Sequence, residues 1–295
     1  MITLGSLIDR TVEHYHKHFR ILAGISLWIV VAAMPFLFSS YIAPFGVDKT
    51  TPTRELIEFL SLNLLGLVTT TVAGFWITAC LILTGEAQAK GITPDHTALG
   101  KQSWKIFPAL CLLSFGIATV FVLVAIILMA PGFAMLWSSN AADSSGSMTM
   151  IIGGALFFIG MIIAALFLAK YSVEVAFAQY ILILETTEKI TPKNIKKVLM
   201  NSIKTSRSMV RGHWWAIAFR LLIPAGIIGF IVYGATYLVN FIVSIGFSFS
   251  VGSISPLGIT LISVASTIGI LIINALIMPL YSLATYYLYD SITKR

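Results

Sequence analysis

Charge is what this sequence lacks most. Of its 295 residues, 11% are charged and 58% are hydrophobic, whereas a soluble domain has about a quarter charged residues and nearly half apolar ones. So few charges cannot cover a surface that faces water. Lipid is therefore the expected solvent for most of the chain. A large soluble domain is excluded, because no stretch between the apolar runs is long enough to hold one.

Catalytic and metal-binding patterns are also missing. The sequence holds no GxxxxGK[ST] phosphate loop, no GxGxxG turn, no HExxH helix and no GxSxG elbow. Cys80 and Cys111 lie inside apolar runs and predict neither a disulfide framework nor a zinc site. His14 and His18 are four residues apart, but no further ligand is evident nearby, so we expect hydrated interfacial histidines and no metal site. These absences predict a protein that is not an enzyme and carries no cofactor.

What the sequence does contain is a set of long apolar runs. A helix needs about 20 apolar residues to cross a bilayer. Six runs of this kind occupy residues 19–43, 56–84, 108–137, 149–184, 216–243 and 257–289. The first run lacks the small-residue cleavage site of a signal peptide, so we expect it to be retained. The predicted fold class is an all-α integral membrane protein with six transmembrane helices, and residues 1–295 are expected to form a single membrane domain.

The basic residues predict the orientation of these spans, because Lys and Arg collect in cytoplasmic loops. Fifteen of the 19 basic residues lie in the terminal segments and in the connections between the second and third and between the fourth and fifth runs. The opposite side has two, Lys49 and Arg54. We therefore expect a protein of the cell membrane with both termini in the cytoplasm. The net charge of +7 then reflects topology and not nucleic-acid binding, which would need a folded basic domain.

Two short marks recur along the chain and indicate an internal repeat. The first is the tripeptide Ile-Thr-Pro at residues 92–94 and 190–192, with a weaker copy at 2–4. The second is an acid followed four residues later by Lys, at Glu86, Glu185 and Asp290. Thr is a common N-cap and Pro suits the first helical position. We predict that each unit holds a cytoplasmic interfacial amphipathic helix and two spans, in a pseudo-threefold repeat with units 3–90, 93–189 and 191–294.

The third amphipathic segment is strongly basic. Its basic side chains are spaced so that they share one helical face: Lys193, Lys197, Lys204, Arg207 and Arg211. A basic amphipathic helix beside a membrane contacts anionic headgroups. Two interpretations stay open. The segment is either an anchor that only sets topology, or a recognition surface for anionic lipids or for a membrane or cytoplasmic protein partner.

One base and one acid fall inside the fourth apolar run. Lys170 and Glu174 are four residues apart. Alignment on Glu185 places Glu174 about 16 Å into the span, near the middle of the hydrocarbon layer. Charges at that depth usually face the bundle interior or a cavity. We predict an intramembrane polar site in which these two residues pair, or one of them bonds to a neighbouring span. A polar centre for a ligand and a register shifted toward the interface are the alternatives.

Several short motifs also resemble those of a known family. They are Glu185, then Ser202 and Ser206 within the basic segment, then Arg211-Gly212 ahead of Trp214-Trp215, and the Tyr-rich sequence 286–290 that ends in Asp. With these motifs the chain resembles the six-span bacterial and archaeal membrane proteins related to the membrane domain of glycerophosphoryl diester phosphodiesterases. The resemblance implies a six-span fold. It implies no diesterase activity, because no phosphodiesterase domain follows Arg295.

Two functions remain open from the sequence. The missing catalytic groups favour a non-enzymatic scaffold or accessory subunit that contacts lipids with its basic cytoplasmic surface. The alternative is a transporter or channel for small solutes or lipids. It is supported by the repeat and by prolines inside the spans, at Pro35, Pro131, Pro224 and Pro279. A continuous polar cavity would favour transport, and a fully apolar interior would favour the scaffold.

Overall fold

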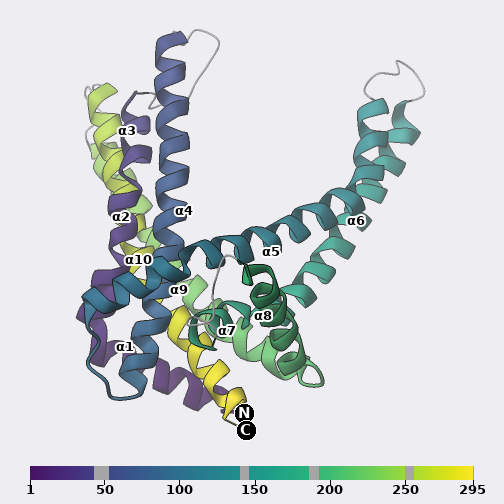
Figure 1. Cartoon of the computed structure of the whole chain (residues 1–295). Coiled ribbons are helices and arrows are strands. Elements are labelled where there is room, and N and C mark those ends of the chain that lie inside the picture. Colours follow the sequence, from purple (N-terminus) through teal and green to yellow (C-terminus); the bar gives the residue numbers. More distant parts are fainter. Residues whose placement is uncertain (43–52, 140–145, 186–192, 250–255, 295) are drawn as a thin grey trace. The chain divides into compact units, whose positions relative to one another are not determined.

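The computed structural model describes residues 1–42, 53–139, 146–185, 193–249 and 256–294. Every regular element within these ranges is an α-helix (Figure 1). The helices are α1 (Leu4–Ser26), α2 (Trp28–Ala32), α3 (Met34–Ile42), α4 (Thr53–Ala89), α5 (His96–Ser139), α6 (Gly146–Val175), α7 (Ala178–Glu185), α8 (Ile195–Val210), α9 (Trp214–Phe249) and α10 (Pro256–Thr293). The predicted all-α class is confirmed for the described part of the chain.

Six helical stretches among the described residues are long and apolar enough to cross a membrane, at Leu4–Ser39, Thr53–Ala89, Thr97–Ser138, Met148–Glu185, Trp214–Val243 and Val264–Thr293. Each overlaps one predicted apolar run. In the most apolar part of each stretch, only 11–33% of the residues are buried. Side chains such as Phe230 and Trp137 are 78% and 72% exposed. Water would penalise this exposure and lipid does not. The chain is therefore a multi-pass membrane protein.

The helices gather into two compact units. Unit 1 comprises Met1–Phe107 and Phe219–Arg295, and unit 2 comprises Pro108–Ala218. Helices α5 and α9 each contribute to both units. Because the repeat boundaries and the single membrane domain are not tested by this division, they stay predictions.

In unit 1, the first predicted span is built from three helical pieces. The dihedral angles of His18 (φ −116°, ψ 19°) leave the helical region inside α1, one residue before the predicted start of the first apolar run. Further short breaks at Leu27 and Ala33 separate α1, α2 and α3. Helices α2, α3, α4 and α10 run side by side (Figure 1). A core cluster of Leu22, Ile77, Leu81 and Leu283 joins α1, α4 and α10.

The ends of the unit 1 helices show which predicted caps form. The Thr3 hydroxyl accepts a hydrogen bond from the Ser6 amide at 3.4 Å, as expected of an N-cap. The start of α5 is capped by Asp95 instead of Thr93, because the Asp95 carboxylate accepts from the Thr97 amide at 2.9 Å. The third copy of this mark, residues 190–192, lies outside the described residues.

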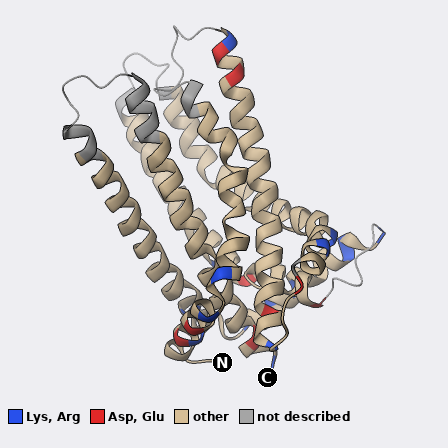
Figure 2. Cartoon of the chain, turned by 90° about the vertical axis from the view of Figure 1, so that its left-hand side faces the viewer, with Lys and Arg blue, Asp and Glu red and all other residues tan. Residues whose placement is uncertain are grey.

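The charged residues of helix α4 lie at its two ends, and the residues between them are uncharged. Arg54 and Glu58 form an ion pair at its start (2.9 Å), and Glu86 and Lys90 form another at its end (2.6 Å). No charged residue lies between Glu58 and Glu86 (Figure 2). After the second pair, Gly91 adopts φ +73° and the helix ends, with the Gly91 amide donating to the Gln88 carbonyl and the Ile92 amide donating to the Ala87 carbonyl. Charge at both ends of a long uncharged helix is the pattern of a span.

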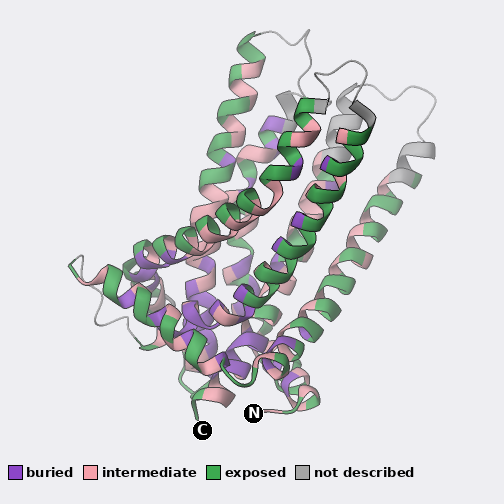
Figure 3. Ribbon diagram, turned by 90° about the vertical axis from the view of Figure 1, so that its right-hand side faces the viewer, coloured by how far each residue is buried: buried purple, intermediate pink, exposed green. Residues whose placement is uncertain are grey.

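In unit 2, α5 and α6 approach closely at glycines. A Cβ atom at Gly160 would overlap the Leu128 carbonyl oxygen, and one at Gly132 would overlap the Phe157 backbone. Most of the other side chains on these two helices are exposed (Figure 3). Small residues that let backbones meet are the usual way for helices to associate in lipid.

We expect Gly160→Ala to destabilise the protein by about 1–3 kcal/mol, because the added methyl group has no space beside α5. Gly154→Ala on the same helix is the matched control, since no heavy atom lies within 4 Å of the point that its added Cβ atom would occupy. It should be neutral or slightly stabilising. Thermal unfolding in detergent compares the two variants, and equal melting temperatures would show that the close approach is absent in solution.

Candidate functional site

Helix α8 has one buried face and one exposed face. Val198, Ser202, Ser206 and Val210 are spaced by four residues and are all buried. The basic residues predicted to share a face are all exposed: Lys193, Lys197, Lys204, Arg207 and Arg211. The helix itself runs from Ile195 to Val210, so two of these five basic residues flank it. Whether the exposed face contacts lipid stays a prediction.

The fourth predicted span is interrupted where α8 packs against it. Helix α6 ends at Val175 and α7 begins at Ala178, so the predicted span over 149–184 consists of two helices with a break that the sequence analysis did not predict. Ser206 accounts for the break. Its hydroxyl donates to the Glu174 carbonyl oxygen at 2.7 Å and accepts from the Phe177 amide at 3.3 Å. Unpaired backbone groups are costly away from water, and this side chain satisfies two of them.

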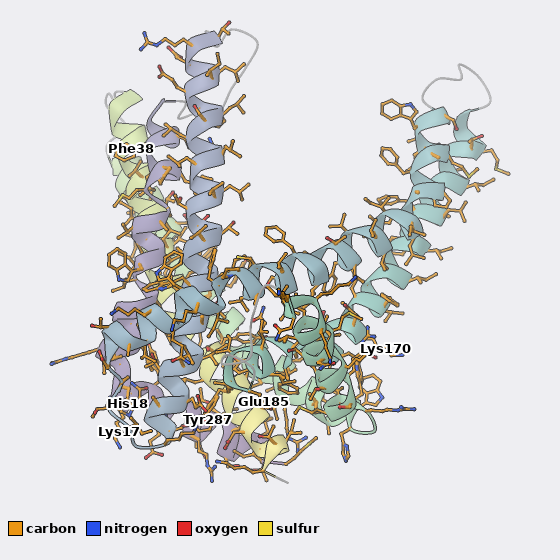
Figure 4. All side chains as sticks on the ribbon, viewed as in Figure 1. Lys17, His18, Phe38, Lys170, Glu185 and Tyr287 are labelled. Atoms are coloured by element: carbon orange, nitrogen blue, oxygen red, sulfur yellow. The ribbon has the colours of Figure 1, made fainter. Side chains whose placement is uncertain are left out.

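The charged side chain at this break is paired with α8. The Glu174 carboxylate lies 3.4 Å from the Arg207 guanidinium, which also lies over the ring of Tyr171, 5.2 Å from its centroid. Lys170 is exposed (Figure 4). Its carbonyl oxygen accepts from the Trp214 indole at 3.3 Å.

Lys170 and Glu174 do not pair with each other, although that pairing was the first of the predicted arrangements. No ion pair joins Lys170 to Glu174 in the part of the chain that the structure describes, and the acid bonds to a neighbouring helix instead. A Lys that precedes Glu by four residues is the weaker pairing order within a helix, whereas α8 presents a guanidinium with an aromatic ring beside it. The depth of Lys170 and Glu174 in a bilayer stays a prediction.

A second polar cluster, in unit 1, is centred on His14. Its Nδ1 atom lies 2.6 Å from the Tyr287 hydroxyl, and its Nε2 atom lies 2.9 Å from the Gln88 side-chain oxygen. In a neutral ring the hydroxyl donates to Nδ1, and Nε2–H donates to the amide oxygen. His14 is 8% exposed, so the expectation of a hydrated histidine is wrong. Leu7, Thr11 and His14 are all buried, and their spacing of four and three residues was the available signal.

The described residues contain no group of three or more potential metal ligands. Comparison with known proteins adds no further assignment, because no family model, curated protein or solved structure matches the chain. The resemblance to six-span proteins related to a phosphodiesterase membrane domain therefore stays a prediction.

Several of the residues that carry this resemblance have packing roles. Ser202 and Ser206 are fully buried on the inner face of α8, and Gly212 adopts φ +84° just after that helix. Tyr286 and Tyr289 are both 5% exposed near the end of α10. These motifs therefore serve the fold at the places where helices meet.

A double-mutant cycle tests the partner of Glu174. We expect Glu174→Gln and Arg207→Gln to show a coupling of about 0.5–1 kcal/mol, modest because the guanidinium side chain is 49% exposed. The cycle of Glu174→Gln with Lys170→Gln is the control and should be additive. Unfolding in detergent supplies the free energies. A larger coupling with Lys170 than with Arg207 would contradict the geometry.

Proposed function

We propose that this chain is a non-enzymatic scaffold or accessory subunit of the cell membrane, whose α8 binds anionic lipid headgroups from the cytoplasmic side. The observation that carries the proposal is the orientation of α8. Val198, Ser202, Ser206 and Val210 on one face are buried within unit 2, and the basic residues are exposed. Both termini would then lie in the cytoplasm, as the distribution of basic residues predicts.

The charges on α8 divide into two groups. Arg207 is engaged by Glu174 and Tyr171. The others make no ion pair within 4.0 Å among the described residues, and these are Lys193, Lys197, Lys204 and Arg211. Each basic residue close to an anionic surface contributes about 1 kcal/mol of binding. We therefore assign headgroup contact to these four and a structural role to Arg207.

A scaffold is favoured over an enzyme by the way the polar groups of unit 2 are used. Ser206 completes the backbone at the helix break, and Glu174 is held by Arg207. These groups bond to one another. The sequence adds none of the nucleophile, phosphate-loop or metal-ligand patterns that would support catalysis.

The threefold repeat is part of the same proposal and is supported by the way each amphipathic segment packs. Each segment contacts the even-numbered span that precedes it, with the first segment contacting the last span. The contacts are His14 with Tyr287 at 2.6 Å, Ser103 with Cys80 at 3.1 Å, and Ser206 with the Glu174 carbonyl at 2.7 Å.

The acid–Lys marks agree with this order. Glu86–Lys90 and Asp290–Lys294 are ion pairs of 2.6 and 2.9 Å. Lys189, the partner expected for Glu185, lies outside the described residues. Equivalent contacts at equivalent chain positions are what a repeated unit of one amphipathic helix and two spans requires.

The alternative, a transporter or channel, is supported by a cavity of about 400 Å³ between α1, α4 and the start of α5. Isoleucine, leucine and tryptophan contribute much of its lining. Such a lining suits hydrocarbon better than a small polar solute, so the lipid branch of this alternative is the one that the cavity favours.

The test is replacement of the four unpaired basic residues by Gln: Lys193, Lys197, Lys204 and Arg211. We expect the amount of anionic phospholipid that stays bound in native mass spectrometry to fall by at least about tenfold, since 1 kcal/mol corresponds to about fivefold per residue. The charge-matched control changes four exposed basic residues elsewhere to Gln, namely Arg10, Lys17, Lys101 and Lys105. Equal losses in both variants would show that total charge, and not α8, retains the lipid.

A further inference from the structure

Unit 1 contains a cavity that is separate from α8. It has a volume of about 400 Å³. One face of α1 lines it from Arg20 to Ile25, and Trp28 at the start of α2 extends this wall. One face of α4 lines it with Trp76, Cys80 and Thr84. The first turns of α5 close it with Leu99 and Gly100. Because Arg20 and Trp28 are exposed, the cavity opens to the surface of unit 1.

Two buried polar atoms on its α4 wall lack partners. The Thr84 hydroxyl and the Trp76 indole nitrogen make no hydrogen bond within the described structure, and Thr84 is fully buried. Other α4 threonines donate to carbonyls of their own helix, at Thr69, Thr70, Thr71 and Thr78. The Thr84 hydroxyl makes no such bond, and it lies where α4 lines the cavity. A buried hydroxyl without a partner costs free energy, so a ligand acceptor would be stabilised there.

The polar and apolar features follow one another along the cavity. Because the chain runs through α1 into α2 in one direction and returns through α4 in the other (Figure 1), Arg20 and Thr84 lie at one end. Trp28, the first residue of α2, and Trp76 of α4 lie at the other end. Each is eight residues from Arg20 or Thr84, or about 12 Å along a helix. Arg20 has no ion pair among the described residues. The cavity thus has a cation and a hydroxyl at one end and an indole N–H with apolar rings at the other.

Glycines keep this space open. Gly24 and Gly100 both line the cavity, and a Cβ atom added at either one would have no heavy atom within 4 Å. A side chain added at either position therefore begins in open space beside the cavity. This allows the cavity to be filled without disturbing the packing around it.

We propose that this cavity binds one anionic glycerophospholipid. The phosphate of the headgroup accepts from Arg20 and Thr84, an ester carbonyl further along accepts from the Trp76 indole, and an acyl chain lies against Ile25 and Trp28. Such a lipid carries the anionic group, the acceptors and the hydrocarbon in the order in which the cavity presents their partners. This site goes beyond the proposed function, which concerns the exposed face of α8.

Native mass spectrometry on the delipidated full chain, with phosphatidylglycerol added back, tests the site. Gly24→Leu should reduce the bound lipid to less than about a tenth of the wild-type amount by filling the cavity. Thr84→Val should weaken binding by about two- to tenfold, the effect of one hydrogen bond. The matched controls on α4 are Gly74→Leu, where space is also open, and Thr78→Val, whose hydroxyl bonds to Gly74. Both controls should bind as the wild type does.

Further measurements distinguish lipid bound in this cavity from lipid or phosphate bound elsewhere on the protein. Phosphatidylcholine should bind less than phosphatidylglycerol, and inorganic phosphate alone should leave the melting temperature unchanged. The variant with four Gln substitutions on α8 should keep the cavity lipid, so failure of the α8 proposal leaves this one standing. Unchanged lipid binding in Gly24→Leu would overturn the proposal, as would equal stabilisation by free phosphate.

Discussion

The backbone break between α6 and α7 exposes the constraint on which this structure depends. A helix that lipid surrounds must satisfy its own polar backbone groups, and here the carbonyl of Glu174 and the amide of Phe177 are satisfied by the Ser206 hydroxyl. That contact fixes the rotation of α8 about its axis. With Ser206 turned inward, Lys197 and Lys204 are necessarily exposed. One side chain, Ser206, therefore both closes the helix break and leaves the basic face of α8 exposed.

The same constraint explains the polar side chains of unit 1. Thr69, Thr70 and Thr78 donate to carbonyls of their own helix, and His14 has partners on both ring nitrogens. These residues lie in apolar surroundings at little cost because each has a partner within the protein. Among the buried hydroxyls of the described structure Thr84 is the exception, and the Trp76 indole and the Gln88 amide nitrogen are likewise buried without a partner. Because the other buried hydroxyls have partners, the unpaired Thr84 hydroxyl favours a bound ligand at this position.

The spans and their approximate bounds could be predicted from the sequence, because apolar length is a property of each segment alone. The kink at His18, for instance, lies one residue before the predicted start of the first run. Contacts between helices could not be predicted in the same way. The partner of Glu174 proved to be Arg207, 33 residues later in the chain. The burial of His14 depends on Tyr287, which no local pattern connects to it.

Cysteine accessibility in whole cells tests the central claim, that the chain crosses the membrane six times with α8 on the cytoplasmic side. Cys80 and Cys111 would first be replaced by Ala, and a single cysteine would be placed at Arg54 or at Lys196, both of which are exposed. A membrane-impermeant thiol reagent should label Arg54→Cys in intact cells and Lys196→Cys only after permeabilisation. Labelling of Lys196→Cys in intact cells would contradict the orientation and, with it, the assignment of α8 to the cytoplasmic leaflet.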